Sequence, residues 1–327
     1  MRRNFYVSDS LSARASQLIH QIKTEMHKKL VAQEELIFAL LTGLVTSGHV
    51  LIEGAPGLAK TLAVSTLCQI ADLDFKRIQF TPDLLPADIV GTMVYNQATG
   101  IFTTKKGAIF ANLVLADEIN RAPAKVQSAL LEAMAERQVT IGEQTHILPS
   151  PFLVLATQNP IEQEGAYRLP EAQLDRFLIK AKIDYPNAHE ELAILQKMGI
   201  EKDIPIHKIL TADDITLLKV ATDAVRVEES IEKYIVSIIV ASRSTDESLP
   251  FTRWLDYGAS PRATLALYRV AKARALFEGR DFVLPEDVKM SALPVLRHRL
   301  VLSYDAEAEE LDSDDVITSI LSMVAVP

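Results

Sequence analysis

Apolar residues along the chain gather in short runs that predict the strands of a parallel sheet. Several runs are apolar on consecutive positions rather than on every second one, which is typical of strands buried on both faces. The runs are bounded by turn residues and cover 49–53, 75–80, 113–117, 152–157 and 178–183. Helical patterns lie between them, notably at 60–71 and 123–137. This alternation predicts an α/β domain of three layers, with helices on both faces of a five-stranded parallel sheet.

The strand signals fade after Pro186, and helical patterns dominate the rest of the chain. We expect helices at 211–222, 228–243 and 261–277, and one from Pro285 onward with acidic residues in its first turn. The pattern therefore predicts two domains. Residues 1–186 would hold N-terminal helices and the α/β core, and residues 187–327 a smaller all-helical domain.

Two segments interrupt the alternation of strands and helices, and both have the pattern of hairpins. One covers 92–104 and turns around 98–100, and the other covers 138–148 and pairs across 142–144. They could be exposed connections without a role of their own. Because loops on a rigid sheet often carry function, contact with a substrate or partner is the preferred interpretation.

Composition narrows the class of protein. A chain of 327 residues with 48% hydrophobic and 24% charged residues is long and apolar enough for two folded domains. The net charge of −9 offers no general excess of cations for a nucleic-acid backbone, which makes nucleic acid an unlikely partner. The single cysteine, Cys68, excludes an intramolecular disulfide and a cysteine metal site.

Neither the N-terminus nor the apolar stretch at 36–52 predicts a membrane-targeted protein. No apolar run follows the two N-terminal arginines, as a signal peptide would require. The stretch at 36–52 is interrupted by small and polar residues and falls short of the roughly 20 apolar residues of a membrane span. It predicts a helix, a turn and a strand, and we expect a cytoplasmic protein without a membrane span.

A glycine-containing loop between a predicted strand and a predicted helix has the pattern of a phosphate-binding loop. Gly54 and Gly57 let backbone N–H groups surround phosphate oxygens, Lys60 neutralises phosphate charge, and Thr61 would hold Mg²⁺. The usual pattern has glycine before the lysine, where this chain has Ala59. We expect a methyl group to be acceptable there, at the start of the helix. The predicted nucleotide-binding residues are Gly54, Ala55, Pro56, Gly57, Leu58, Ala59, Lys60, Thr61 and Leu62.

Polar side chains follow two further predicted strands. Asp117 and Glu118 come at the end of an apolar run, at the edge of an open α/β sheet where ligands bind. Asp117 suits Mg²⁺ binding, and Glu118 suits orientation and deprotonation of an attacking water. Asn159 follows the next run and could position the same water or contact the γ-phosphate. It could equally be a turn-forming residue before proline.

Two arginines are candidates for stabilising the charge that develops during phosphoanhydride hydrolysis. Arg176 and Arg262 each stand at the start of a predicted element. An isolated arginine is usually a solvated surface charge, so the residues alone do not decide between the two interpretations.

Six segments, read in order, closely resemble the AAA+ ATPases and specifically the MoxR family. They are VAQEE, GAPGLAKT, LVLADEINRAP, ATQNP, EAQLDRF and GASPRATLAL, and the resemblance runs from about residue 30 to 300. It implies that 54–61 is the Walker A loop, that Asp117 and Glu118 are the Walker B pair, and that Asn159 is the first sensor. Arg176 is then similar to the finger that reaches a neighbouring subunit's nucleotide, and Arg262 to the second sensor on a helical lid.

The same resemblance implies further contacts and an assembly. Arg121 would face the subunit boundary, and Val31 and Gln33 would flank the adenine, with Ala32 where glycine is common. A finger donated in trans implies a ring, typically a homo-hexamer, with ATP and Mg²⁺ as cofactors. The two hairpins match the helix-two insert and the pre-sensor hairpin. MoxR members resemble chaperones that remodel protein clients, often with a partner that carries a von Willebrand factor A domain.

Two alternatives to a remodelling ATPase stay open at this point. One is a nucleic-acid motor or loader of the same superfamily, for which Lys105 and Lys106 beside the first hairpin are the best support. The other is a scaffold switched by nucleotide with little turnover. Glu118 argues against the scaffold, because binding alone has little use for a carboxylate that activates water.

Overall fold

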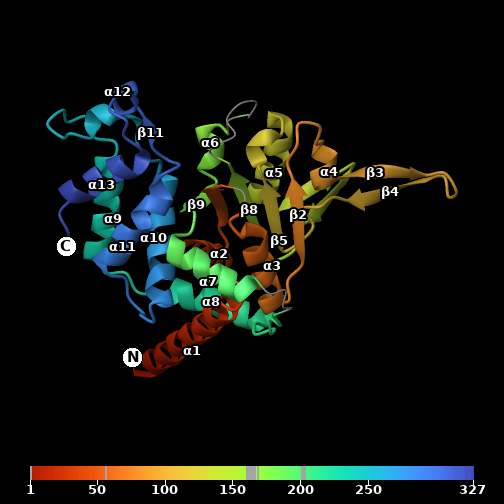
Figure 1. The fold of residues 1–327 in the computed structure, drawn as a ribbon, viewed down its shortest axis with the longest axis horizontal. Coiled ribbons are helices and arrows are strands. Elements are labelled where there is room, and N and C mark those ends of the chain that lie inside the picture. Colours follow the sequence, from red (N-terminus) through yellow and green to blue (C-terminus); the bar gives the residue numbers. More distant parts are fainter. Residues whose placement is uncertain (1, 56, 160–166, 168, 200–203) are drawn as a thin grey trace. The chain divides into compact units, whose positions relative to one another are not determined.

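The computed structural model describes residues 2–55, 57–159, 167, 169–199 and 204–327, and the chain divides into two compact units (Figure 1). The sheet unit consists of Ile22–Arg176 and Ala181–Thr211. The helical unit consists of Met1–Gln21, Phe177–Lys180 and Ala212–Pro327. Each unit is described by itself.

The chain forms a five-stranded sheet in the order β2-β5-β8-β1-β9, which belongs to the sheet unit except for the first four residues of β9. Its strands are β1 (His49–Gly54), β2 (Phe75–Gln79), β5 (Leu113–Asp117), β8 (Leu153–Gln158) and β9 (Phe177–Ile183). The β2–β5, β5–β8 and β8–β1 pairs are parallel. The three inner strands β1, β5 and β8 are buried along almost their whole length, which explains their consecutive apolar residues. The predicted α/β fold is confirmed, with strand ends within one residue of those expected.

Helices surround this sheet in the sheet unit. The longer ones are α2 (Glu34–Thr46), α3 (Lys60–Ala71), α5 (Ala124–Glu136) and α7 (Ala188–Met198), and the short ones are α4 (Pro86–Val90), α6 (Glu171–Leu174) and the 3₁₀ turn η1 (Ile119–Arg121). Helix α3 buries Val64, Leu67 and Ile70. Cys68 is buried on the same helix, and burial raises the pKa of its thiol to about 12, so it acts as a small apolar residue.

Both predicted hairpins are present in the sheet unit. Strands β3 (Gly91–Asn96) and β4 (Ile101–Lys106) form a long hairpin that projects from the sheet, and β6 (Gln138–Ile141) pairs with β7 (Gln144–Ile147) (Figure 1). The turn of the second hairpin uses Gly142 at φ +64°, a conformation that favours glycine. A Cβ atom there would lie 3.1 Å from the side chain of Met93, so the two hairpins are in contact.

The helical unit is built from helices and one short pair of strands. Its helices are α1 (Arg2–Met26, of which residues to 21 belong here), α8 (Ala212–Ala224), α9 (Glu229–Ala241), η2 (Thr252–Trp254), α10 (Pro261–Phe277), α11 (Pro285–Leu296), α12 (Tyr304–Ala308) and α13 (Ser313–Met323). Strands β10 (Leu255–Tyr257) and β11 (Val301–Leu302) pair antiparallel, although strand signals are weak in this part of the sequence. Among the described residues, no helix combines the length and the apolar character needed to cross a membrane.

The division into units differs from the boundary expected at residue 186. Helix α7 and the chain as far as Thr211 belong to the sheet unit. One physical reason is a pair of hydrogen bonds at the end of α3, where the amides of Ile209 and Leu210 donate to the carbonyl of Ile70. Such a long-range backbone contact leaves no local pattern in the sequence.

Candidate nucleotide-binding site

The carboxyl ends of β1, β5 and β8 open on one cavity of ≈ 400 Å³ in the sheet unit. Its described lining brings together residues from three separate sequence motifs. They are Gly54, Gly57, Leu58, Ala59, Lys60, Thr61, Leu62, Asp117, Glu118 and Asn159, joined by Arg77 and Thr157. A cavity at this edge of an open α/β sheet is the usual position of a ligand site.

The loop between β1 and α3 has the backbone shape that a phosphate requires. A Cβ atom on Gly54 would lie 2.6 Å from the carbonyl oxygen of Ile183, so this position admits only glycine. Gly57 has φ +86° and open space around its Cα atom. Helix α3 begins at Lys60, with its N-terminal end at the cavity, and no side chain caps it. Pro56, also predicted to bind nucleotide, lies outside the described residues. The loop and the helix end can therefore present N–H groups to an anion.

Ala59 occupies a strained position in this loop. It is the N-cap residue of α3 and has φ 55° and ψ 17°, in the left-handed region. A Cβ atom in this conformation costs roughly 1–2 kcal/mol, so the methyl group expected at the helix start is accommodated with strain. Ala32, beside the predicted adenine segment, has a similar φ of 53°.

Lys60 supplies a cation to the cavity. Its ammonium group donates to the carbonyl of Gly54 at 2.8 Å. Burial lowers the pKa of Lys60, and attraction by Asp117 and Glu118 partly opposes this. The lysine and the two carboxylates are therefore close enough to interact electrostatically, as a shared phosphate and metal site requires.

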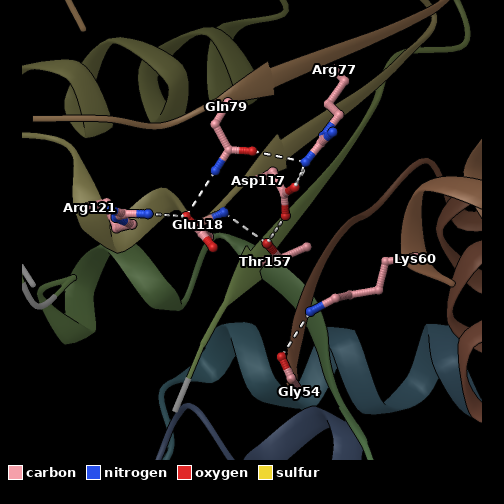
Figure 2. A network of polar contacts seen from close by, with 8 residues as sticks. All are labelled: Gly54, Lys60, Arg77, Gln79, Asp117, Glu118, Arg121 and Thr157. Carbon is pink, nitrogen blue, oxygen red and sulfur yellow. Dashed lines mark hydrogen bonds and ion pairs between the residues drawn. The ribbon is translucent and has the colours of Figure 1, made fainter. Parts of the chain in front are cut away.

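The two carboxylates at the end of β5 are held by hydrogen bonds from several elements (Figure 2). The hydroxyl of Thr157 donates to Oδ1 of Asp117 at 2.6 Å, and Nη2 of Arg77 lies 2.5 Å from Oδ2. Oε2 of Glu118 accepts from Gln79 at 2.9 Å and from Arg121 at 2.8 Å. The backbone of Glu118 is left-handed, with φ 56°. Strain of this kind in a non-glycine residue is common at functional sites.

Three residues of this network were missed by the sequence interpretation: Arg77, Gln79 and Thr157. Thr157 could have been noticed, because it stands two residues before Asn159 at the end of the same strand. Arg77 and Gln79 reach the site only because β2 pairs with β5, with Gln79 beside Asp117 in the register. No local sequence motif predicts the pairing of β2 with β5.

The remaining predicted residues take different positions. Asn159 lines the cavity and is 8% exposed. The described lining does not include Arg176, Val31 or Gln33. The exposed Arg176 donates to the carbonyl of Leu131 on α5 at 2.6 Å.

Arg262 belongs to the helical unit, in the first turn of α10, where its amide donates to the hydroxyl of Ser260. Described residues of the predicted Walker motifs and the first sensor therefore line one cavity of the sheet unit. The functions of both arginines stay predictions.

Nucleotide and Mg²⁺ fit the chemistry of this lining. Glycine backbone and a helix N-terminus suit phosphate, and Lys60 neutralises part of its charge. Mg²⁺ in phosphate sites is held by one or two carboxylates and by the phosphates themselves rather than by a complete protein cage. This agrees with Asp117, which lines the cavity beside Lys60 and Thr61, as a metal-facing carboxylate.

A phosphate loop followed by α3, with an Asp–Glu pair on β5 and an asparagine after β8, defines an AAA+ nucleotide-binding ATPase fold. The family model for the ATPase family associated with various cellular activities (AAA) matches residues 49–179, and the AAA lid domain model matches residues 253–320. Its similarity to relatives named MoxR1 and MoxR shows that the chain belongs to the MoxR family of AAA+ ATPases.

Relatives of similar length support this assignment. The chain is 48% identical to Chaperone MoxR1 of Mycobacterium tuberculosis, over 93% of this chain and 81% of the relative. It is 27% identical to Protein MoxR of Methylorubrum extorquens, over 94% of both chains. The crystal structure of a Cytophaga hutchinsonii protein superposes with a TM-score of 0.92 at 48% identity, over 99% of both chains.

Proposed function

We propose that the chain hydrolyses ATP to ADP and phosphate in a Mg²⁺-dependent reaction and uses the energy to remodel a protein client. The observation that carries the proposal is the single cavity shared by Lys60, Asp117 and Glu118. A binding scaffold needs the lysine and the loop. Only hydrolysis gives a use to a second carboxylate beside the metal-facing one.

Each residue of the cavity has a chemical role in this reaction. Lys60 and the loop N–H groups bind the β- and γ-phosphates, while Thr61 and Asp117 would hold Mg²⁺. When bound, the metal neutralises charge on the phosphates. Glu118 orients a water molecule and takes its proton, and Asn159 orients the water or the γ-phosphate.

A ring of subunits, which we expect to be a homo-hexamer, would complete the site. Arg176 is exposed and lies outside the described lining of the cavity, as expected of a finger that serves a neighbour. Arg262 would act as the second sensor from the helical unit. Arg121, which now binds Glu118, would lie near the subunit boundary.

The β3–β4 hairpin is the proposed contact with the client. Its side chains include exposed apolar and aromatic groups, with Ile101 and Phe102 each 61% exposed and Tyr95 packed against Phe102 at 5.1 Å between ring centroids. Exposed apolar groups on a projecting element favour a protein surface over nucleic acid. The relative named as a chaperone supports the same class of partner. A partner with a von Willebrand factor A domain is proposed on family resemblance alone.

The substitution Glu118→Gln tests hydrolysis and identifies the client. We expect the variant to bind ATP with wild-type affinity and to lose turnover by about 10²–10⁴-fold, because the amide cannot take a proton. Phosphate release and equilibrium binding of a fluorescent ATP analogue measure the two effects. Glu229→Gln, at an exposed ion pair on α9, is the matched control. Equal turnover in Glu118→Gln and wild type would refute the role of Glu118, and proteins retained by the variant only with ATP are candidate clients.

Mixing two inactive variants tests the finger in trans. Lys60→Ala keeps Arg176 but loses its own site, whereas Arg176→Ala keeps the site but loses the finger. We expect mixed rings to recover part of the turnover that either variant lacks alone, since some Arg176→Ala sites then face an intact finger. Light scattering verifies that the mixed rings assemble. If they assemble and recover no turnover, the result would count against a shared site.

A further inference from the structure

Helix α5 carries a buried glutamine whose amide group meets three backbone carbonyls. Gln127 is fully buried. Its Nε2 atom donates to the carbonyl of Ile119 at 3.2 Å and to those of Ala122 and Tyr167 at 3.1 Å each. The first two belong to the turn after Glu118, which is formed by η1 and its C-cap, whereas Tyr167 comes 40 residues after Gln127. One side chain therefore joins two segments that are distant in the sequence.

The contacts of Gln127 are not those that stability alone would favour. Its amide nitrogen has two hydrogens, so the three carbonyls share them. Its Oε1 atom is buried and has no hydrogen-bond partner in the described part of the chain. A buried polar atom without a partner costs stability. What the two segments use is therefore the pair of donors on Gln127.

The backbone of Tyr167 is held on the turn after Glu118 from both sides. Its amide donates to the carbonyl of Asn120 at 2.7 Å, and its carbonyl accepts from Gln127. The side chain of Tyr167 is 47% exposed, so these backbone contacts rather than burial of the ring fix its position. The turn and the chain around Tyr167 are thus joined in one arrangement.

The segment from Tyr167 to Arg176 depends on such contacts for its position. Its helix α6 has four residues, none of them buried, and Leu169 is the one buried residue among those described in the segment. A segment with so little buried apolar surface is not held firmly by packing. At its far end, Arg176 donates to the carbonyl of Leu131. Gln127 and Leu131 stand about one turn apart on α5, so one helix holds both ends of the segment.

We propose that Gln127 is a positioning residue that fixes the finger-bearing segment, from Tyr167 to Arg176, onto the turn after Glu118. The inference rests on the proposed hydrolysis and on Arg176 acting in trans. The turn beside the carboxylate of one site, and the finger that the same subunit extends to its neighbour, then share one support. A misplacement of about 1 Å can lower a rate by about 10²-fold, so turnover should report the loss of this support.

Mixed rings show whether Gln127 acts through the finger. Lys60→Ala subunits have no active site of their own, so they contribute turnover only through the Arg176 that they extend to an Arg176→Ala neighbour. We expect Gln127→Met in the Lys60→Ala subunits to lower the recovered turnover about tenfold, because methionine has a similar volume but no donor. Phosphate release from equimolar mixtures measures it. Unchanged recovery, in rings that assemble normally, would overturn the proposal.

Leu130→Val in the same Lys60→Ala subunits is the matched control. Leu130 is fully buried on α5, and shortening its side chain loosens the packing of the helix without removing a hydrogen-bond donor. We expect the recovered turnover to stay within about twofold of that with Lys60→Ala alone. A loss as large as that in Gln127→Met would mean that general loosening of α5 is responsible, and would refute the role of the Gln127 amide.

Gln127→Glu tests the donor by pH and does not depend on folding of the methionine variant. The protonated carboxyl is similar in size to the amide and donates one hydrogen, whereas the ionised form donates none. Burial raises the pKa of a carboxyl to roughly 7–9. In Lys60→Ala subunits we therefore expect the recovered turnover, relative to the same rings with glutamine, to fall about threefold or more between pH 6 and pH 9. A flat ratio would contradict a donor role.

The mixed rings that retain Gln127 distinguish failure of the proposed function from failure of its positioning role. If rings of Lys60→Ala and Arg176→Ala assemble and recover no turnover, the finger in trans fails and the role of Gln127 falls with it. If they recover turnover and Gln127→Met leaves it unchanged, hydrolysis and the finger stand and only the role of Gln127 is refuted.

Discussion

The amino ends of the sheet strands, called the amino edge, and their carboxyl ends, called the carboxyl edge, differ in how their polar groups are arranged. At the amino edge, His49 accepts a hydrogen bond from the Val154 amide at its Nδ1 atom, at 3.0 Å, and its Nε2 atom lies 3.1 Å from the carbonyl of Met134. Asn112 similarly accepts from the Asp74 amide and donates to the carbonyl of Pro151. These contacts form a paired network that is buried at His49 and partly exposed at Asn112.

At the carboxyl edge, the backbone is strained and the polar groups are charged. Ala59 and Glu118 both have left-handed backbone, and Lys60 is half-buried beside two carboxylates. The difference teaches that stability and chemistry are placed at opposite ends of β1, β5 and β8. A site that binds charged ligands tolerates strained backbone and partly buried charge, and the rest of the sheet offsets that cost.

The largest expected effect is on the carboxyl edge. Lys60→Ala removes the cation that would face the phosphates, and we expect Mg²⁺-ATP affinity to fall about 10³-fold, or about 4 kcal/mol. The free energy of unfolding should change little, because the lysine is partly desolvated without a salt bridge of its own in the described contacts. Calorimetric titration and denaturant unfolding measure the two quantities, with Lys208→Ala, at an exposed ion pair, as control. A large loss of stability without loss of affinity would mean that Lys60 stabilises the fold and does not bind the nucleotide, which would contradict the prediction.

At the amino edge, His49 should make the stability of the fold depend on pH. Burial lowers the pKa of His49 from its usual 6.5 to about 4. The unfolded chain therefore takes up a proton below pH 6.5 that the folded chain refuses, and stability is lost as pH falls from 6.5 toward 4. The part of the free energy of unfolding lost through this histidine over that pH range is about 3 kcal/mol.

Unfolding by urea at several pH values, in wild type and in His49→Gln, isolates this effect from that of the carboxylates. We expect the variant to be less stable at pH 7 and to show a flatter dependence between pH 6.5 and 4. Parallel curves for the two proteins would mean that the histidine is not buried as a neutral base.

The smallest effect concerns strain in the phosphate loop. Ala59→Gly relieves the left-handed Cβ at the N-cap of α3, and we expect the free energy of unfolding to rise by up to about 1 kcal/mol. Thermal unfolding in the absence of nucleotide measures it, with an alanine of normal backbone, Ala63→Gly on the same helix, as the opposite control. A loss of stability in Ala59→Gly would show that the loop is not strained at this residue.

Local sequence patterns were enough to predict the kinds of element and the contiguous part of the site. Runs of apolar residues mark strands such as β5 because burial on both faces requires it, and 54–61 carries its own glycines, lysine and threonine within one turn of chain. Those features are local, so the order of residues suffices to recognise them. The order of the six motifs carries the family resemblance, which implied a role for each motif.

Tertiary structure alone decided what surrounds that loop. It brought Arg77 and Gln79 to Asp117 and Glu118, because the pairing of β2 with β5 joins residues 38 positions apart in the chain. It also placed Ala59 in a left-handed backbone conformation, and it joined residues 188–211 to the sheet unit. Register, backbone strain and long-range hydrogen bonds depend on which segments meet in space, and no local pattern of residues encodes that meeting.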